Sequence, residues 1–353
     1  EYLVELAKEY LSTEGPAVLG APEDERLDRL GVFAVMRITE GQRRVLSAYG
    51  VEFDNWFSER ALREGGKPPR VLERLRERGF VYDAEGAAWF RSTAFGDDKD
   101  RVLVKSDGEA TYFVNDIAYH VDKIERGFER LIDLYGPDHH GHVLRMQAAL
   151  KALGYPDGIL DILIIQLVTL LREGQPVRMS KRMGEFVTME ELIGEVGRDA
   201  ARFTFLTRRH DSPLDFDLEV VTRQTAENPV YYVQYAHARI ASIFQHLREK
   251  KLPLPDWRKV DLGLLRLGEE QSLIKRLLQF PHVAAAAARA LEPHRIAYYL
   301  QELAGLFHPY YKSHRVIGDD LALTHARLAL AAGVGLVVRS GLDLLGVSAP
   351  EKM

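Results

Sequence analysis

Apolar residues recur at helical spacing in the opening part of the chain. They repeat at intervals of three and four across residues 1–15, and again across 26–46 and 70–78, which predicts a helix over each segment. Before the third helix, residues 65–69 read Gly-Gly-Lys-Pro-Pro. We expect a flexible, helix-breaking loop there.

Short apolar runs separated by Asp and Gly turns follow, and this pattern is typical of strands. Residues 80–82, 87–90 and 101–105 predict a β-meander. Residues 111–114 predict a further strand, which leads into a helix over 116–126.

Strands and helices then alternate along the chain. Residues 130–134 predict a buried strand, 143–153 a helix, and 159–170 contain another strand. Strands that alternate with helices indicate an α/β domain with a largely parallel sheet.

The strand signal fades from about residue 198, and the last third predicts a helical bundle. Its long segments each carry one apolar face, as packed helices do. The predicted helices cover 228–249, 261–280, 293–315 and 320–346.

Length and composition limit the class of protein. A chain of 353 residues allows two or three domains, each with its own core. The absence of cysteine excludes disulfides, thiolate zinc sites, iron–sulfur clusters and cysteine nucleophiles. The longest apolar stretches, 158–171 and 328–338, are shorter than the roughly 20 residues that cross a bilayer, so we expect no membrane span.

The charge is unevenly distributed. A net charge of −5 argues against indiscriminate nucleic-acid binding. Residues 227–353, however, contain 16 Lys and Arg against 12 Asp and Glu, a net charge of +4, whereas the residues before them carry −9. Two interpretations stay open for the basic segment: a solvated helical surface, or a module that faces a polyanion.

The segment Gly136-Pro137-Asp138-His139-His140-Gly141-His142 directly follows a predicted strand. Open α/β sheets bind ligands at the carboxyl ends of strands, where loops converge and helix N-termini offer free N–H groups. We therefore favour a nucleotide or substrate contact. A purely structural loop and a metal site of His139, His140 and His142 are the alternatives, although no His-Glu-x-x-His spacing is present.

A second cluster, Val177-Arg178-Met179-Ser180-Lys181-Arg182-Met183-Gly184, combines cations, a hydroxyl and a glycine. Such a loop is suited to stay in contact with a triphosphate while negative charge shifts along it during phosphate displacement. A solvated basic loop is the simpler interpretation. The sequence contains no G-x-x-x-x-G-K-[ST] phosphate-binding loop.

Tyr112 and Asp116 lie four residues apart at a predicted strand-to-helix junction. Asp116 is suited either to cap the helix or, as a buried carboxylate beside a phenol, to hold a guanidinium by charge-assisted hydrogen bonds. The sequence leaves both open.

The first helix of the predicted bundle is rich in tyrosine. Tyr231, Tyr235 and Arg239 share one face, with Tyr232 and Gln234 to either side. Aromatic rings with an interleaved Arg and Gln stack on unpaired bases and hydrogen-bond to their edges. Tyrosines with solvated hydroxyls at a domain junction are the alternative.

Together these residues resemble the bacterial arginyl-tRNA synthetases, a family of class I aminoacyl-tRNA synthetases. No single match is decisive, but their number and order are specific. The matching segments are Gly50 to Trp56 with Ser58-Glu59, Phe95 to Leu103, Thr111 to Phe113 with Asp116 to His120, Gly136 to Gly141, Arg178 to Arg182, Asn228 to Arg239, and Gly341 to Met353.

The resemblance implies a fold and a domain order. Residues 1–197 would form the second part of a Rossmann-like catalytic domain, including a connective insertion and the Met-Ser-Lys loop. Residues 198–226 would be a linking helical segment. Residues 227–353 would form an all-α anticodon-binding domain.

The resemblance also implies an activity: ATP-dependent attachment of L-arginine to tRNA(Arg) through arginyl-adenylate. Mg²⁺ would accompany ATP, no protein-bound metal is expected, and the enzyme would be a cytoplasmic monomer that needs bound tRNA to form the adenylate. Tyr112, Asp116 and His139 would bind arginine. Gly136, Asp138, His139 and Arg178 would bind ATP, Met179, Ser180 and Lys181 would act in catalysis, and Tyr231, Tyr232, Gln234, Tyr235, Arg239 and Met353 would contact tRNA.

The sequence departs from the family pattern in two ways. Arg178 stands where many class I enzymes have a lysine, and the His-x-Gly-His signature is absent. The chain also opens at Glu1-Tyr2-Leu3, with no initiator Met and no secretion signal. We therefore expect the carboxyl-terminal portion of a longer enzyme, a poor catalyst by itself; a non-catalytic tRNA- or RNA-binding paralogue is the alternative.

Overall fold

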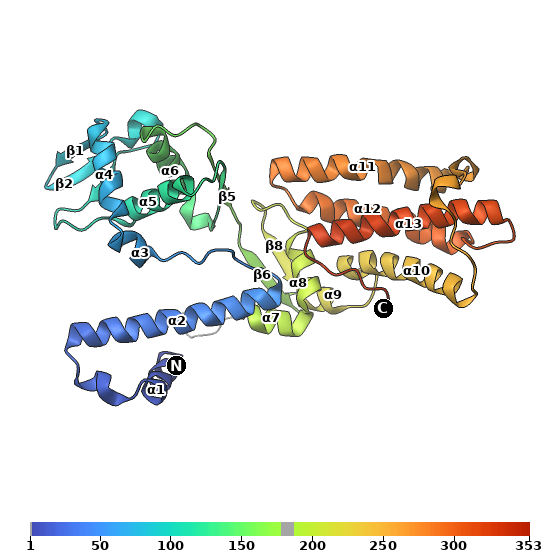
Figure 1. Ribbon diagram of the computed structural model, residues 1–353, viewed down its shortest axis with the longest axis horizontal. Coiled ribbons are helices and arrows are strands. Elements are labelled where there is room, and N and C mark those ends of the chain that lie inside the picture. The colour runs from blue at the N-terminus through green and yellow to red at the C-terminus, as the bar shows by residue number, and fades with distance from the viewer. Residues whose placement is uncertain (1, 178–186) are drawn as a thin grey trace. The chain divides into compact units, whose positions relative to one another are not determined.

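A computed structural model describes residues 2–177 and 187–353 (Figure 1). It contains two compact units. The first, here the helical unit, comprises Glu1–Asp54, Leu170–Thr207 and Phe216–Met353. The second, here the α/β unit, comprises Asn55–Thr169 and Arg208–Asp215. The predicted domain division at residues 197 and 227 stays a prediction.

The α/β unit begins with helices and a three-stranded meander. The strands β1 and β2 are antiparallel and joined by a two-residue turn, Glu85-Gly86, in which both residues have positive φ (53° and 76°). Such turns match the twist of antiparallel strands. The elements of this part are α3 (Glu59–Glu64), α4 (Lys67–Glu77), β1 (Val81–Ala84), β2 (Ala87–Phe90), η2 (Ser92–Phe95) and β3 (Arg101–Val104).

The second part of the α/β unit alternates strands and helices. Strands β4 and β5 pair in parallel, with Leu131 opposite Leu160. Helices α5 and α6 share one core with the meander, in which Phe90, Ile117 and Met146 are fully buried. The elements are α5 (Tyr112–Glu125), β4 (Leu131–Tyr135), η3 (Pro137–His139), α6 (His140–Ala152) and β5 (Leu160–Ile164).

The prediction of an α/β part followed along the chain by a helical bundle is confirmed, but the largely parallel sheet is wrong for the described residues. Strands β4 and β5 pair in parallel, whereas β1-β2-β3 and the pair β6–β7 are antiparallel. The reason lies in the connections: short turns join antiparallel neighbours, whereas a parallel pair needs a crossover such as α6.

Three departures of the structure from the predicted elements have a clear physical reason. The strand over 111–114 is wrong, because sheet pairing ends at the bridge between Val104 and Ala110, and Thr111 is already the N-cap of α5. Helix α4 includes Lys67 to Pro69, since proline is tolerated in a first helical turn. Helix α11 (Gly268–Ala290) starts later than predicted and continues through Pro281 into an alanine-rich segment that favours helix.

The helical unit is built around four long helices that run alongside one another (Figure 1). They are α10 (Pro229–Glu249), α11, α12 (His294–Ser313) and α13 (Leu321–Leu344). Helix α13 is long and apolar enough to cross a membrane by length and composition. In the structure it packs against α10, α11 and α12, and Val334, Val338 and Leu342 are fully buried. Its apolar character is that of the central helix of a bundle.

The remaining elements of the chain are shorter, apart from α2. Arg202 on α8 ties several of them together: its guanidinium donates to the carbonyl oxygens of Tyr49 (3.2 Å) and Gly50 (3.1 Å) after α2, and of Leu345 (2.7 Å) after α13. These elements are α1 (Tyr2–Thr13), η1 (Pro16–Gly20), α2 (Glu23–Tyr49), β6 (Val168–Arg172), β7 (Gln175–Pro176), α7 (Met189–Val196), α8 (Arg198–Phe205), β8 (Leu214–Asp217), α9 (Leu218–Thr222), η4 (Trp257–Lys259) and η5 (Leu262–Leu264), with the strand order β7-β6-β8.

Candidate functional site

The first turns of α5 hold Tyr112 and Asp116 on one face. Tyr112 is the first helical residue and is 81% exposed, and Asp116 follows one turn later with a half-buried carboxylate. Asp116 is therefore not the helix cap. Burial, with the nearby carboxylates of Glu59 and Asp133, raises its pKa above the usual value, although His120 and Arg145 oppose this. A partly desolvated carboxylate of this kind favours a cationic ligand.

The loop after β4 brings its histidines toward the same place. His142 Nε2 on α6 lies 3.9 Å from Asp116 Oδ2, and the His139 ring centroid is 5.6 Å from that of His142. Asp138 and His139 are exposed in η3. A Cβ at Gly136 would meet Asp138 Oδ1 at 2.8 Å, so a larger residue there would displace that exposed carboxylate.

His142 is held in its neutral form. Burial, together with the positive charges of Arg145 and His139, lowers its pKa to about 4. Its Nδ1 atom and Arg145 Nε are buried and have no hydrogen-bond partner within the part of the chain that the structure describes. Buried polar atoms without partners are rare in native proteins and concentrate at functional sites.

A buried network that the sequence did not reveal supports this face of α5. His120 Nδ1 lies 2.6 Å from the Asp116 backbone oxygen, and His120 Nε2 lies 2.6 Å from Asp133 Oδ2 on β4. Lys123 Nζ and the Tyr135 hydroxyl also donate to Asp133, at 2.8 Å and 3.1 Å. Although burial by itself raises the pKa of Asp133, His120 and Lys123 hold it well below its usual range.

The geometry assigns a role to each group in this network. Both His120 ring nitrogens face oxygen acceptors, the Asp116 carbonyl and the Asp133 carboxylate, and the Lys123 ammonium faces the second carboxylate oxygen of Asp133. The network locks α5 onto β4 by charge-assisted hydrogen bonds. Asp116 is thereby fixed at the carboxyl end of β4, next to the histidine loop.

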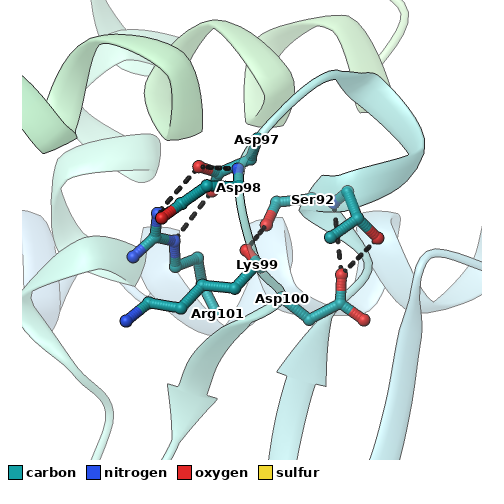
Figure 2. Close-up of polar contacts among 7 residues, drawn as sticks. Ser92, Asp97, Asp98, Lys99, Asp100 and Arg101 are labelled. Carbon is teal, nitrogen blue, oxygen red and sulfur yellow. Dashed lines mark hydrogen bonds and ion pairs between the residues drawn. The ribbon is translucent and has the colours of Figure 1, made fainter.

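A second ionic cluster, in the loop over residues 92–101, orders the segment before β3 (Figure 2). Arg101 donates to both carboxylate oxygens of Asp97, at 2.8 Å and 2.7 Å, and also contacts Asp98. Burial alone would raise the pKa of Asp97, but the hydrogen bonds it receives, first from Arg101, lower it to about 2. The Ser92 hydroxyl donates to the Lys99 carbonyl oxygen at 2.7 Å, which closes the loop.

The predicted aromatic face of α10 is present in the helical unit. The Tyr231 and Tyr235 rings are stacked with centroids 5.7 Å apart, and the Arg239 guanidinium lies 4.3 Å from the Tyr235 centroid. Arg239 Nη1 also lies 3.0 Å from His308 Nδ1 on α12. Tyr232 packs against the same histidine, with centroids 4.5 Å apart. These half-buried rings form a continuous surface suited to stacking.

Gln234 faces the interior instead. It is buried, and its Nε2 donates to Asp199 Oδ2 and to the Ser348 carbonyl oxygen, both at 2.9 Å. Nearby, His237 Nδ1 donates to the Pro350 carbonyl oxygen at 2.9 Å. The bonds from Gln234 to Ser348 and from His237 to Pro350 hold the tail after α13 against α10. Met353, at the end of this tail, is half exposed.

The remaining predicted site residues fall outside the described part of the chain. These are Arg178, Met179, Ser180 and Lys181. The chain is described again from residue 187, where Thr188 and Glu191 form a reciprocal capping box at the start of α7. Within the residues that the structure describes, no three His, Asp or Glu side chains converge in a way that could hold a metal ion, and this includes His139, His140 and His142.

Two family models match the chain. Residues 61–245 match the model of class I tRNA synthetases (R), catalytic domain, and residues 233–353 match the DALR anticodon binding domain. Together they match residues 61–353, a catalytic domain followed by an anticodon-binding domain, so the predicted fold class is confirmed.

Curated relatives are arginine–tRNA ligases. The protein of Desulforamulus reducens is 49% identical over 353 residues, which is all of this chain and 63% of the relative. That of Desulfosudis oleivorans is 53% identical over 322 residues, 91% of this chain and 58% of the relative. The chain thus spans less than two thirds of the length of these relatives.

Solved structures of arginyl-tRNA synthetases resemble this chain. An arginyl-tRNA synthetase structure from Campylobacter jejuni has a TM-score of 0.89 at 34% identity and covers 100% of this chain and 76% of that one. The Thermus thermophilus arginyl-tRNA synthetase shares the fold, with a TM-score of 0.75 at 23% identity over 96% of this chain and 68% of that one.

Proposed function

We propose, from the premise that this chain belongs to the arginyl-tRNA synthetase family of class I synthetases, that it is the carboxyl-terminal part of an arginine–tRNA ligase. The whole enzyme would activate L-arginine with ATP to arginyl-adenylate and pyrophosphate, and then transfer the arginyl group to the terminal adenosine of tRNA(Arg). The observation that carries this proposal is the half-buried carboxylate of Asp116, held beside the histidine loop by a buried ionic network.

Arginine recognition would rest on Asp116. Its carboxylate offers two acceptors to a planar guanidinium, and the low polarity that raises its pKa strengthens the pairing once the cation is bound. The exposed phenol of Tyr112, one turn away, would lie along the side chain of the amino acid. His139 would complete the amino-acid side of this pocket.

ATP recognition would use the loop after β4 and the Met-Ser-Lys segment. Gly136 and Asp138 would lie near the ribose and adenine, with His139 and Arg178 as further contacts. Met179, Ser180 and Lys181 would close over the nucleotide, and the Lys181 ammonium would stabilise the negative charge that develops on the departing pyrophosphate. Mg²⁺ would arrive with ATP as part of the substrate, and no resident metal is required.

The tRNA would be read by the helical unit. The stacked rings of Tyr231 and Tyr235 with Arg239 offer π surfaces and a cation to unpaired bases, and Tyr232 extends this surface. Met353 lies at the end of the tail that Gln234 anchors, so Gln234 would act through this anchor when tRNA binds. The proposed whole enzyme would be a monomer and would act in the cytoplasm.

Arginine-dependent exchange between ATP and pyrophosphate tests the activity. The full-length protein, assayed with tRNA(Arg) present, should exchange label with arginine and not with lysine or citrulline. Citrulline is the informative control because it keeps the shape of arginine and lacks the charge that Asp116 would recognise. Exchange with citrulline comparable to that with arginine would contradict the role of Asp116, and no exchange with any amino acid, despite tRNA binding, would favour a non-catalytic paralogue.

A further inference from the structure

Arg145 is a half-buried cation at the edge of the site, and the proposed recognition of arginine and ATP does not use it. It lies one turn after His142 on α6, so the two side chains leave the same face of the helix. The Arg145 guanidinium lies over the buried ring of Phe113, 5.9 Å from its centroid, and His142 packs against the same ring. Phe113 directly follows Tyr112 in α5, so Arg145 borders the pocket proposed for arginine.

Arg145 carries a charge that no direct partner neutralises in the part of the chain that the structure describes. Its Nε atom is buried there without a hydrogen-bond partner. Burial lowers the pKa of Arg145, and the neighbouring Arg101 adds to this effect. The carboxylates of Asp97, Asp116 and Asp98 raise the same pKa, through their charges and not through hydrogen bonds. Because a guanidinium stays protonated in proteins, Arg145 is a fixed cation beside these carboxylates.

The oxygens of the Asp116 carboxylate are open to a ligand. His142 Nε2 approaches Oδ2 to 3.9 Å, which is too long for a hydrogen bond. The ionisable groups that act on this carboxylate come from each neighbouring element: Glu59 on α3, His120 on α5, Asp133 on β4, and His142 and Arg145 on α6. Burial raises the pKa of Asp116, and Arg145 lowers it. Arg145 thus favours the ionised carboxylate without contacting its oxygens.

The loop over residues 92–101 and the Phe113 ring hold Arg145 away from a direct pair with Asp116. Helix η2 of this loop packs against α6. Asp97, 7% exposed, is fixed by its two hydrogen bonds from Arg101, so its charge attracts Arg145 from a rigid position (Figure 2). The face of the Phe113 ring adds a cation–π attraction.

Resting on the proposed function, we propose that Arg145 is a positioning residue for arginine recognition. It holds the negative charge on Asp116 and leaves both carboxylate oxygens free for the guanidinium of the substrate. A direct pair between Arg145 and Asp116 would compete with the substrate for these oxygens. Arg145 and the substrate repel each other, but the two carboxylates of Asp97 and Asp98 outnumber the one guanidinium of Arg101, and this excess negative charge offsets part of the repulsion.

The pH dependence of arginine binding tests this role. Arginine-dependent exchange between ATP and pyrophosphate is measured with the full-length protein and tRNA(Arg) at pH 8 and pH 5.5. Arg145→Met keeps an unbranched side chain and removes the charge, so Asp116 should take up a proton at a higher pH. Between the two pH values, the KM for arginine should rise roughly fivefold more in this variant than in the unsubstituted protein, since a nearby cation shifts the pKa of a carboxylate by about one unit or more. The KM for ATP should not follow this rise.

Two further variants separate charge from packing. Arg145→Lys restores a cation of a different shape, so its pH profile should return to that of the unsubstituted protein. Arg76→Met removes an exposed guanidinium on α4 that pairs with Asp83, and it should leave the KM for arginine unchanged at both pH values. His142, with a pKa of about 4, stays neutral throughout this range, and the other histidines are common to all the proteins compared. A circular dichroism melt checks the fold, and Arg145→Gln, with the same expected profile, replaces Arg145→Met if that variant is unfolded.

The outcomes separate this inference from the proposed function. A pH profile of Arg145→Met that matches the unsubstituted protein would overturn the role of Arg145 and leave arginine recognition by Asp116 in place. An equal rise in the KM for arginine at both pH values, without rescue by Arg145→Lys, would show a packing role instead and would also overturn it. If the unsubstituted full-length protein exchanges no label with arginine, the proposed function fails and this inference fails with it.

Discussion

In the proposed enzyme, the Asp116 carboxylate determines the specificity for arginine. Asp116→Asn keeps the size of the side chain and removes its charge, so the guanidinium would lose a charge-assisted contact of about 1.5–3 kcal/mol. We expect the KM for arginine to rise by roughly 10- to 150-fold in full-length exchange assays, while the KM for ATP changes little. Asp83→Asn, an exposed carboxylate on β1 that pairs with Arg76, is the matched control and should leave both values unchanged. An equal rise in both KM values would indicate a general structural defect instead.

His142 makes a second, pH-dependent contribution at the residue scale. Its folded pKa of about 4 lies below the ordinary value of 6.5, so between these two values the unfolded state binds the extra proton. Stability from this residue is therefore complete above pH 6.5 and is lost as the pH falls toward 4, by about 1.4 kcal/mol for each pH unit.

Urea unfolding at pH 7 and pH 5 checks the sign. The unsubstituted chain should lose about 2 kcal/mol more between these two values than His142→Asn does, because the variant lacks the titrating ring. His140→Asn, at an exposed position in the same loop, controls for a general effect of losing a histidine and should behave like the unsubstituted chain. A variant whose pH dependence matches the unsubstituted chain would show that another group is responsible.

At the scale of elements, charged side chains as well as apolar ones stabilise the contact between α5 and β4. Asp133→Asn would leave the largely buried ammonium of Lys123 without its carboxylate partner and would remove the acceptor that faces His120 Nε2. Breaking a buried ion pair in this way costs about 3–5 kcal/mol. The exposed pair of Lys151 and Asp157 provides the control, and Asp157→Asn should cost less than about 1 kcal/mol. Chemical denaturation of the three proteins measures both differences, and equal costs would contradict the structural role assigned to Asp133.

The accuracy of the sequence-based predictions depended on how far apart the interacting residues lie along the chain. Helical spacing was enough to locate the bundle and to place Tyr231, Tyr235 and Arg239 on one face, because neighbours on a helix are three or four residues apart. The network that supports Asp116 was harder to predict, because His120 lies on α5 and its partner Asp133 lies on β4. Sequence distance carries no information about such a pair.

Two further differences between prediction and structure have identifiable physical causes. Residues 111–114 contain two aromatic and two β-branched residues, which favour strand. Phe113, Val114 and Ile117, however, are all buried in the core of the α/β unit, and packing there selected the helix. Gln234 was predicted from its neighbours to face RNA. Its burial against Asp199 and Ser348 depends on the tail after α13, about 110 residues later, which no local pattern reports.

At the scale of the whole chain, charge divides along the sequence and not between the two compact units. Residues 227–353, all in the helical unit, carry a net charge of +4, whereas residues 1–226, which contribute to both units, carry −9. Like-charge repulsion from the acidic part opposes RNA binding, so binding must depend on contacts within the basic helices. Affinity for tRNA is then expected to fall steeply with salt even though the net charge of the chain is negative.

We predict that this chain binds tRNA but catalyses pyrophosphate exchange only slowly. The 353 residues contain the anticodon-binding match but no His-x-Gly-His signature, and they span 63% of the Desulforamulus reducens relative. We expect the chain to bind tRNA(Arg) more tightly than a tRNA with an unrelated anticodon, and to exchange pyrophosphate at least a hundredfold more slowly than that full-length relative, because half of the ATP-binding groups of the class would be missing. Filter binding and exchange assays on the same preparation measure both quantities, and Tyr235→Ala should abolish the preference between the two tRNAs without changing the residual exchange. Exchange by the chain alone at the rate of the relative would show that these residues hold a complete nucleotide site.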